Sequence, residues 1–202
     1  MRTAVFICLL IAPLLAAAQP DTVKPTPSPR LDPAQIDLGA LIECRGNLEK
    51  FRYLGPARVD PLQAVALGWR PLPQANLFMT EYALVRPISV FGQVTPHIAF
   101  TADSVIAVLD LPDPRPLAQQ LALETAIDTA DKAMFGKELV SEETLDPVSG
   151  TAYIRSVVLN VSNVASHPGK TLVGCSYSLD LAEDPEAAVD TGTAPGLEAS
   201  PR

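Results

Sequence analysis

Alternating apolar and polar positions dominate the second half of the chain and predict β-strands there. The clearest run is residues 151–163, where Ile154, Val157 and Val161 belong to one long β-rich segment. Turn residues separate these runs, as in the Asp-Pro-Val-Ser-Gly stretch at 146–150. Strands are predicted at residues 77–85, 88–91, 97–101, 105–109, 137–144, 151–163 and 171–181.

Apolar residues spaced three to four positions apart predict short helices, mostly before the strands. Residues 61–70 are the clearest case, because Asp60 can cap the helix, Pro61 suits its first position and Pro71 stops it. Further short helices are predicted at residues 48–54, 115–123 and 128–135.

Residues 36–44 carry a mixed pattern. Ile36, Leu38 and Ile42 share one face of an extended chain, which predicts a half-buried strand. Leu41 breaks this alternation and leaves a helix open as the alternative.

Helices come first and hairpin-linked strands follow, without regular alternation of the two. This order predicts an α+β fold with a mainly antiparallel sheet and two to four short helices, in one domain over residues 36–181. The proline-rich residues 19–35 are expected to form an extended spacer before the domain. The acidic residues 182–202, which lack aromatic side chains, are expected to be a disordered tail.

Residues 1–18 have the pattern of a secretory signal peptide. Arg2 is followed by an uncharged apolar stretch that ends in small residues, with Ala16 and Ala18 at the positions a signal peptidase recognises. The run is too short to span about 30 Å of hydrocarbon. We therefore expect a periplasmic or secreted protein that does not insert into a membrane after cleavage.

Without residues 1–18, the chain keeps two cysteines, Cys44 and Cys175. In an exported protein they are predicted to form a disulfide that joins the two ends of the domain, with two buried free thiols as the alternative. No metal site is predicted, because two cysteines and two distant histidines show no ligand spacing. No cofactor is predicted either, since no glycine-rich phosphate loop occurs.

The formal net charge of −8, from 15 basic and 23 acidic residues, argues against a nucleic-acid partner. An acidic surface can steer association with a cationic protein, although charge that serves only solubility is the other interpretation. The acidic side chains predicted to contact such a partner lie in two regions: Asp110, Asp113, Glu142, Glu143 and Asp146.

His97 and His167 are the two histidines of the chain and the candidates for general-base chemistry. No G-x-S-x-G motif accompanies them, so no catalytic residue is assigned. The sequence predicts an exported, non-catalytic protein-binding domain, for example a periplasmic inhibitor or immunity protein against a cationic effector or hydrolase. Two alternatives stay open: a secreted hydrolase that uses His97 or His167, and a structural or assembly factor of the cell envelope.

Overall fold

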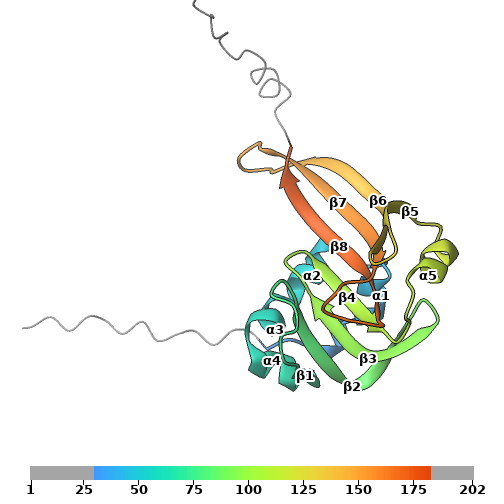
Figure 1. Ribbon diagram of the computed structural model, residues 1–202. Helices are drawn as coiled ribbons and strands as arrows, with labels where there is room; N and C mark the ends of the chain where they lie inside the picture. Colours follow the sequence, from blue (N-terminus) through green and yellow to red (C-terminus); the bar gives the residue numbers. More distant parts are fainter. Residues whose placement is uncertain (1–29, 183–202) are drawn as a thin grey trace, which may run out of the picture.

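The computed structural model describes residues 30–182, in which eight strands form one antiparallel sheet in the order β1-β2-β3-β4-β8-β7-β6-β5 (Figure 1). The strands are β1 (Trp69–Pro71), β2 (Thr80–Val90), β3 (Gln93–Phe100), β4 (Ser104–Leu109), β5 (Glu124–Asp128), β6 (Ala133–Leu145), β7 (Ala152–Ser162) and β8 (Thr171–Leu181). The helices are η1 (Pro33–Gln35), α1 (Leu38–Ile42), α2 (Leu48–Tyr53), α3 (Gly55–Val59), α4 (Pro61–Ala66) and α5 (Arg115–Gln120). The predicted α+β class is confirmed, with five short α-helices in this part of the chain rather than two to four.

Side-chain caps set the starts of the predicted helices. The side-chain oxygens of Asn47 and Asp60 each accept a backbone N–H at 2.9 Å, at the beginning of α2 and α4. Each cap satisfies a donor that has no partner inside its own helix. The sequence predicted where both helices start. The helix predicted over residues 61–70 ends earlier, however, at Ala66, because Trp69 and Arg70 belong to β1 and pair with β2.

The segment 36–44 is helical, so the preferred strand is wrong and the helical alternative is right. The Asp37 carboxylate accepts the backbone N–H of Ala40 at 2.9 Å and caps α1. Leu38, Leu41 and Ile42 then lie on one side of the helix and are buried. Burial of Leu41 on that side explains why it breaks the period-two pattern.

Two further predictions also change. Residues 128–135, predicted as a helix, instead end β5 and begin β6. The backbone N–H of Thr129 donates to the Lys132 carbonyl at 2.8 Å, which closes a tight hairpin between the two strands. Residues 77–85 and 88–91, predicted as two strands, contribute to the single strand β2, whose register against β3 shifts between Ala83 and Ile88.

The predicted disulfide between Cys44 and Cys175 is confirmed, with Cα atoms 5.2 Å apart and a sequence separation of 131 residues. Cys44 follows α1 with φ of 56°. Cys175 lies in β8, which pairs with β4 on one side and β7 on the other. The bridge therefore joins the residues just after the first α-helix to β8, which is the last strand of the chain and lies in the middle of the sheet.

The sheet is covered on both faces near β2, β3, β4 and β8. Its inner face packs on the helices in the main core, where α1 contacts β2, β4 and β8 (Figure 1). Its outer face carries a smaller apolar cluster of Met79, Ala99, Val108 and Leu172, with Val164 packed against it. Met79 and Val164 belong to the loops before β2 and after β7, so these two loops cover the outer face.

The predicted signal peptide, most of the spacer and nearly all of the acidic tail lie outside the described residues. Residues 31–35, from the predicted spacer, pack against the domain. Leu31 is buried, and the backbone N–H of Asp32 donates to the Tyr53 hydroxyl at 2.9 Å. Within residues 30–182, none of the helices combines the length and the apolar character that crossing a membrane requires.

Candidate metal centre

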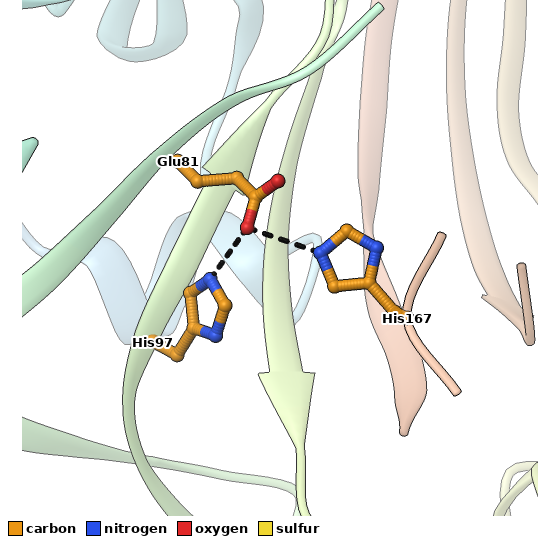
Figure 2. A group of neighbouring side chains, drawn as sticks. All are labelled: Glu81, His97 and His167. Atoms are coloured by element: carbon orange, nitrogen blue, oxygen red, sulfur yellow. Dashed lines mark hydrogen bonds and ion pairs between the residues drawn. The ribbon is translucent and has the colours of Figure 1, made fainter. Parts of the chain in front are cut away.

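Three side chains from separate parts of the chain converge on the outer face of the sheet (Figure 2). Glu81 comes from β2, His97 from β3, and His167 from the loop between β7 and β8. The Nε2 atoms of His97 and His167 lie 2.9 Å and 3.0 Å from the same oxygen, Oε2 of Glu81. The two histidines left open as candidates by the sequence are thus brought together, with a glutamate that the sequence did not single out.

Strand alternation places Glu81 and His97 on this face. Their neighbours Tyr82 and Ile98 pair with each other and point into the main core, so Glu81 and His97 point outward. Glu81 pairs directly with Ala99, two residues from His97. Glu81 and His97 are therefore diagonal neighbours on one face, within reach for long side chains.

A tight turn carries His167 over the sheet. Its backbone N–H donates to the Val164 carbonyl at 3.0 Å, and its carbonyl accepts from Lys170 at 3.2 Å. Gly169 has φ of 70°, a conformation that glycine adopts without strain. The turn therefore presents the imidazole to the sheet immediately before β8 begins.

The cluster is largely shielded from water. The side chains of Glu81 and His167 are 3% and 6% exposed, whereas that of His97 is 25% exposed. Burial raises the pKa of Glu81, but hydrogen bonds from His167 and then His97 outweigh it, and the net pKa lies below its ordinary value. Glu81 is thus held as a carboxylate.

One oxygen of this carboxylate has no partner. Oε1 of Glu81 is buried and forms no hydrogen bond with any of residues 30–182. Leaving a buried polar atom unsatisfied costs about 1–3 kcal/mol, and more when the group is charged. A cation bound by both oxygens of the carboxylate, together with the two imidazoles, would remove this cost.

A hydrogen-bond chain fixes the orientation of the His167 ring. Nδ1 of His167 lies 3.0 Å from the Ser166 hydroxyl, which also accepts from the Asn76 side-chain amide at 3.2 Å. In this network the serine O–H donates to Nδ1, which assigns the ring proton to Nε2, facing Glu81. The same contact would hold the ring if Nε2 bound a metal and Nδ1 carried the proton.

The donor set suits a divalent transition metal. Imidazole nitrogen and carboxylate oxygen bind Zn²⁺ at about 2.0–2.2 Å, which places neighbouring ligands of a tetrahedral ion about 3.3 Å apart. One ligand atom from each of the three residues lies within 4.8 Å of the other two. The two contacts of 2.9 Å and 3.0 Å are about 0.3–0.4 Å shorter than this ligand spacing.

The five acidic residues predicted as partner contacts do not gather in one place. Asp110 and Asp113 follow β4, near the start of β8, while Glu142, Glu143 and Asp146 lie near the far end of β8. The eleven residues of β8 separate the two groups by about 30 Å.

Most of these acidic side chains also have partners within the domain. Asp110 pairs with Lys170, Asp113 with Arg115, and Glu142 with Arg155. Asp146 accepts two backbone N–H groups from residues 148 and 149 in the β6–β7 turn. Binding of a cationic protein through these residues stays a prediction, as does a structural or assembly role in the cell envelope.

Comparison of the chain with models of known protein families, with curated proteins and with solved structures found no match.

The sequence did not reveal the candidate metal centre because His97 and His167 lie 16 and 86 residues after Glu81. Recognisable metal motifs have much shorter spacings. One local signal was available. Glu81 alternates with Met79 and Ala83 on one face of the predicted strand 77–85, and a charged residue between apolar positions of a strand requires a partner if that face is buried.

Proposed function

We propose that this chain is an exported protein that binds one divalent transition-metal ion, Zn²⁺ in the first instance, through Glu81, His97 and His167. One observation carries the proposal: two imidazole Nε2 atoms converge on a single buried carboxylate oxygen. Hydrogen bonding alone accounts for Oε2 but leaves Oε1 of Glu81 unsatisfied. A metal ion binds all three side chains, and its positive charge balances the negative charge of the buried Glu81 carboxylate.

The ligand atoms limit which metal ions the site would bind. Two nitrogen donors and one carboxylate favour Zn²⁺, Cu²⁺, Ni²⁺ or Co²⁺ over Ca²⁺ or Mg²⁺, which prefer oxygen ligands. The confirmed disulfide fits an oxidising compartment outside the cytoplasm. Periplasmic or secreted placement is part of the proposal.

Calorimetric titration of the chelator-treated protein with ZnCl₂ at pH 7.5 tests the proposal. The expected result is one Zn²⁺ per chain, with affinity lost in Glu81→Gln and in His97→Gln. Glu142→Gln is the matched control, because this exposed carboxylate lies on the β6–β7 hairpin, away from the site. Absence of binding to the wild-type protein, or equal binding by His97→Gln, would overturn the proposal.

Thermal unfolding gives an independent readout that allows for folding defects in the variants. Zn²⁺ at about 100 times its Kd should stabilise the wild-type protein by about 2.7 kcal/mol. His97→Gln should fold normally, since its side chain is already partly exposed, but should gain no stability from Zn²⁺. Equal stabilisation of the wild type and His97→Gln by Zn²⁺ would show that the metal binds at another site.

A secreted hydrolase is the second candidate, and one chain of contacts favours it. The Ser166 hydroxyl, the His167 ring and the Glu81 carboxylate are linked in series by contacts of 3.0 Å and 3.0 Å, the order of a nucleophile, a base and the carboxylate that orients the base. Labelling of Ser166 by a fluorophosphonate probe, abolished in Ser166→Ala, would support this function. An unlabelled wild-type protein would exclude it.

A further inference from the structure

The sheet has an open edge along the second half of β6. β5 pairs with β6 only as far as Gly136, whereas β6 continues beside β7 to Leu145. After a register shift between Glu138 and Val140, residues 140–145 keep a regular register with β7. Within residues 30–182, β7 is the one strand that pairs with this stretch. Figure 1 shows the far ends of β6 and β7 extending away from the helices.

The backbone of residues 140–145 has unpaired hydrogen-bonding groups on the open side. The backbone N–H of Asp146 donates to the Thr151 carbonyl across the β6–β7 turn. Pairs with and without such hydrogen bonds alternate along an antiparallel ladder. The N–H and C=O groups of Leu145, Glu143 and Ser141 therefore point away from β7. A strand added at this edge would find a donor and an acceptor at every second residue.

This edge lacks the usual protection of an exposed strand. Native proteins protect strand edges, because unpaired backbone groups are a template for pairing with another chain. At the opposite end of the sheet, β1 has only three residues and ends in Pro71, which cannot donate a hydrogen bond. Residues 140–145 contain neither proline nor lysine, two residues that commonly block an edge. The open edge of β6 is thus available to a further strand.

The charge beside this edge determines which strand fits. Residues 137–145 carry three carboxylates and one ammonium: Glu138, Glu142, Glu143 and Lys137. Glu142 pairs with Arg155 of β7, whereas Glu143 forms no ion pair with any of residues 30–182. A second copy of the same edge would set like charges against each other, which destabilises strand pairing. A positively charged strand has the complementary charge.

Two of these carboxylates share one face of the sheet. Glu138 pairs with Val158, and Glu143 pairs with Ile154. Val158 and Ile154 are four residues apart on β7, so their side chains and those of both glutamates point to the same face. A strand with a basic residue at every second position would place its basic side chains on that face.

We propose that residues 140–145 of β6 bind an extended, positively charged segment of another protein, which joins the sheet as an antiparallel strand. Glu142 and Glu143, which the sequence predicts as contacts of a cationic partner, both belong to this edge. The surface is separate from the candidate metal centre, because β4, β8 and β7 lie between β3 and β6 in the sheet. The proposal is therefore independent of metal binding.

Fluorescence anisotropy measures this binding with a labelled peptide, acetyl-Lys-Val-Lys-Val-Lys-Val-Lys-amide, at pH 7.5 and low ionic strength. EDTA is present so that no metal takes part. The wild type should bind one peptide per chain, and NMR should show slower hydrogen exchange at the backbone amides of Ser141, Glu143 and Leu145. Absence of saturable binding, or slower exchange only outside residues 137–145, rules the proposal out.

Two methylated peptides separate strand addition from attraction between charges. In the antiparallel arrangement, the lysine N–H groups face β6 and the valine N–H groups point away from it. Methylation of the lysine backbone nitrogens should weaken binding about tenfold or more, since several hydrogen bonds are lost, while methylation of the valine nitrogens should change it less than about twofold. Both peptides keep the charge of the parent, so equal binding by the two would contradict strand addition.

Proline substitution tests the same contact from the side of the protein. Ser141→Pro removes an N–H that points away from β7, so the variant should fold and yet bind the peptide about fivefold or more weakly. Ser141→Ala is the matched control, because it keeps the N–H and should bind as the wild type does. If Ser141→Pro does not fold, the methylated peptides decide the question. Equal binding by folded Ser141→Pro and Ser141→Ala would exclude this edge as the docking site.

Glu143→Gln tests the choice of a cationic partner. It should weaken binding up to about fivefold at low salt, the range for an exposed ion pair, and the difference should shrink as salt is added. Glu49→Gln, which changes an exposed carboxylate on α2, should leave binding within about twofold of the wild type. Sedimentation should find a monomer. A dimer that Ser141→Pro abolishes would make a second copy the occupant and refute the proposal.

Discussion

Removal of the Cys44–Cys175 disulfide is expected to lower the free energy of unfolding by about 5 kcal/mol. The bridge spans 131 residues, and the chain-entropy relation for a loop of that length gives about 5 kcal/mol at 25 °C. Single domains are stable by about 5–15 kcal/mol in total. The double variant Cys44→Ala/Cys175→Ala should therefore be at the limit of folding.

Trp69 provides the assay, because it is the single tryptophan of the chain and is buried. It stacks on Phe100 with ring centroids 5.8 Å apart, so its fluorescence should change when the core opens. In urea titrations, the reduced protein and the double variant should unfold along the same curve. The oxidised protein should unfold at a higher urea concentration. A loss below about 1 kcal/mol would refute the entropic argument.

Three further outcomes are expected. Ser166→Ala removes the contact that orients His167 and should weaken Zn²⁺ binding about 10- to 100-fold by chelator competition, without changing the one-to-one stoichiometry. Burial raises the pKa of Tyr177 to about 12, against about 10 in the unfolded chain, so only the unfolded state releases the phenol proton between these values. Tyr177 should therefore contribute a loss of about 2 kcal/mol of stability as pH rises from 10 to 12, and Tyr177→Phe should lose less stability than the wild type by that amount when denaturant titrations are repeated across this range. Gly174→Ala would place a Cβ 2.2 Å from the Val105 carbonyl and should cost about 1–3 kcal/mol in thermal unfolding, whereas Gly55→Ala, with open space around it, should be close to neutral.

Local patterns predicted the parts of the fold that local forces decide. β8 has the bounds that its alternation predicts, and α2 and α4 begin at the capping residues Asn47 and Asp60. The disulfide followed from counting cysteines once the first residues were interpreted as a signal peptide. Each of these predictions needed only a few neighbouring residues or the rule that the cysteines of an exported protein form disulfides.

The failures share a physical cause, which is competition from distant contacts. Residues 36–44 have apolar positions compatible with either period, and packing of α1 against β2, β4 and β8 selects the helix. Residues 128–135 form a hairpin because Ala133 and Phe135 are buried on the sheet. Short segments carry too little local preference to resist such contacts.

The candidate metal centre depends on distant contacts even more strongly than these segments do. It requires the pairing of β2 with β3 and the return of the 163–170 loop over the outer face of the sheet. Neither can be derived from spacing along the chain. The acidic residues were conspicuous in sequence, yet their partners Lys170, Arg115 and Arg155 are set by strand register and turn geometry.

An anomalous difference map from crystals grown with Zn²⁺, recorded at the zinc absorption edge, tests the central claim most directly. The expected map has one strong peak per chain, at about 2.0–2.2 Å from a carboxylate oxygen of Glu81 and from Nε2 of both His97 and His167. A map without a peak between these three side chains, in crystals that contain Zn²⁺, would contradict the account.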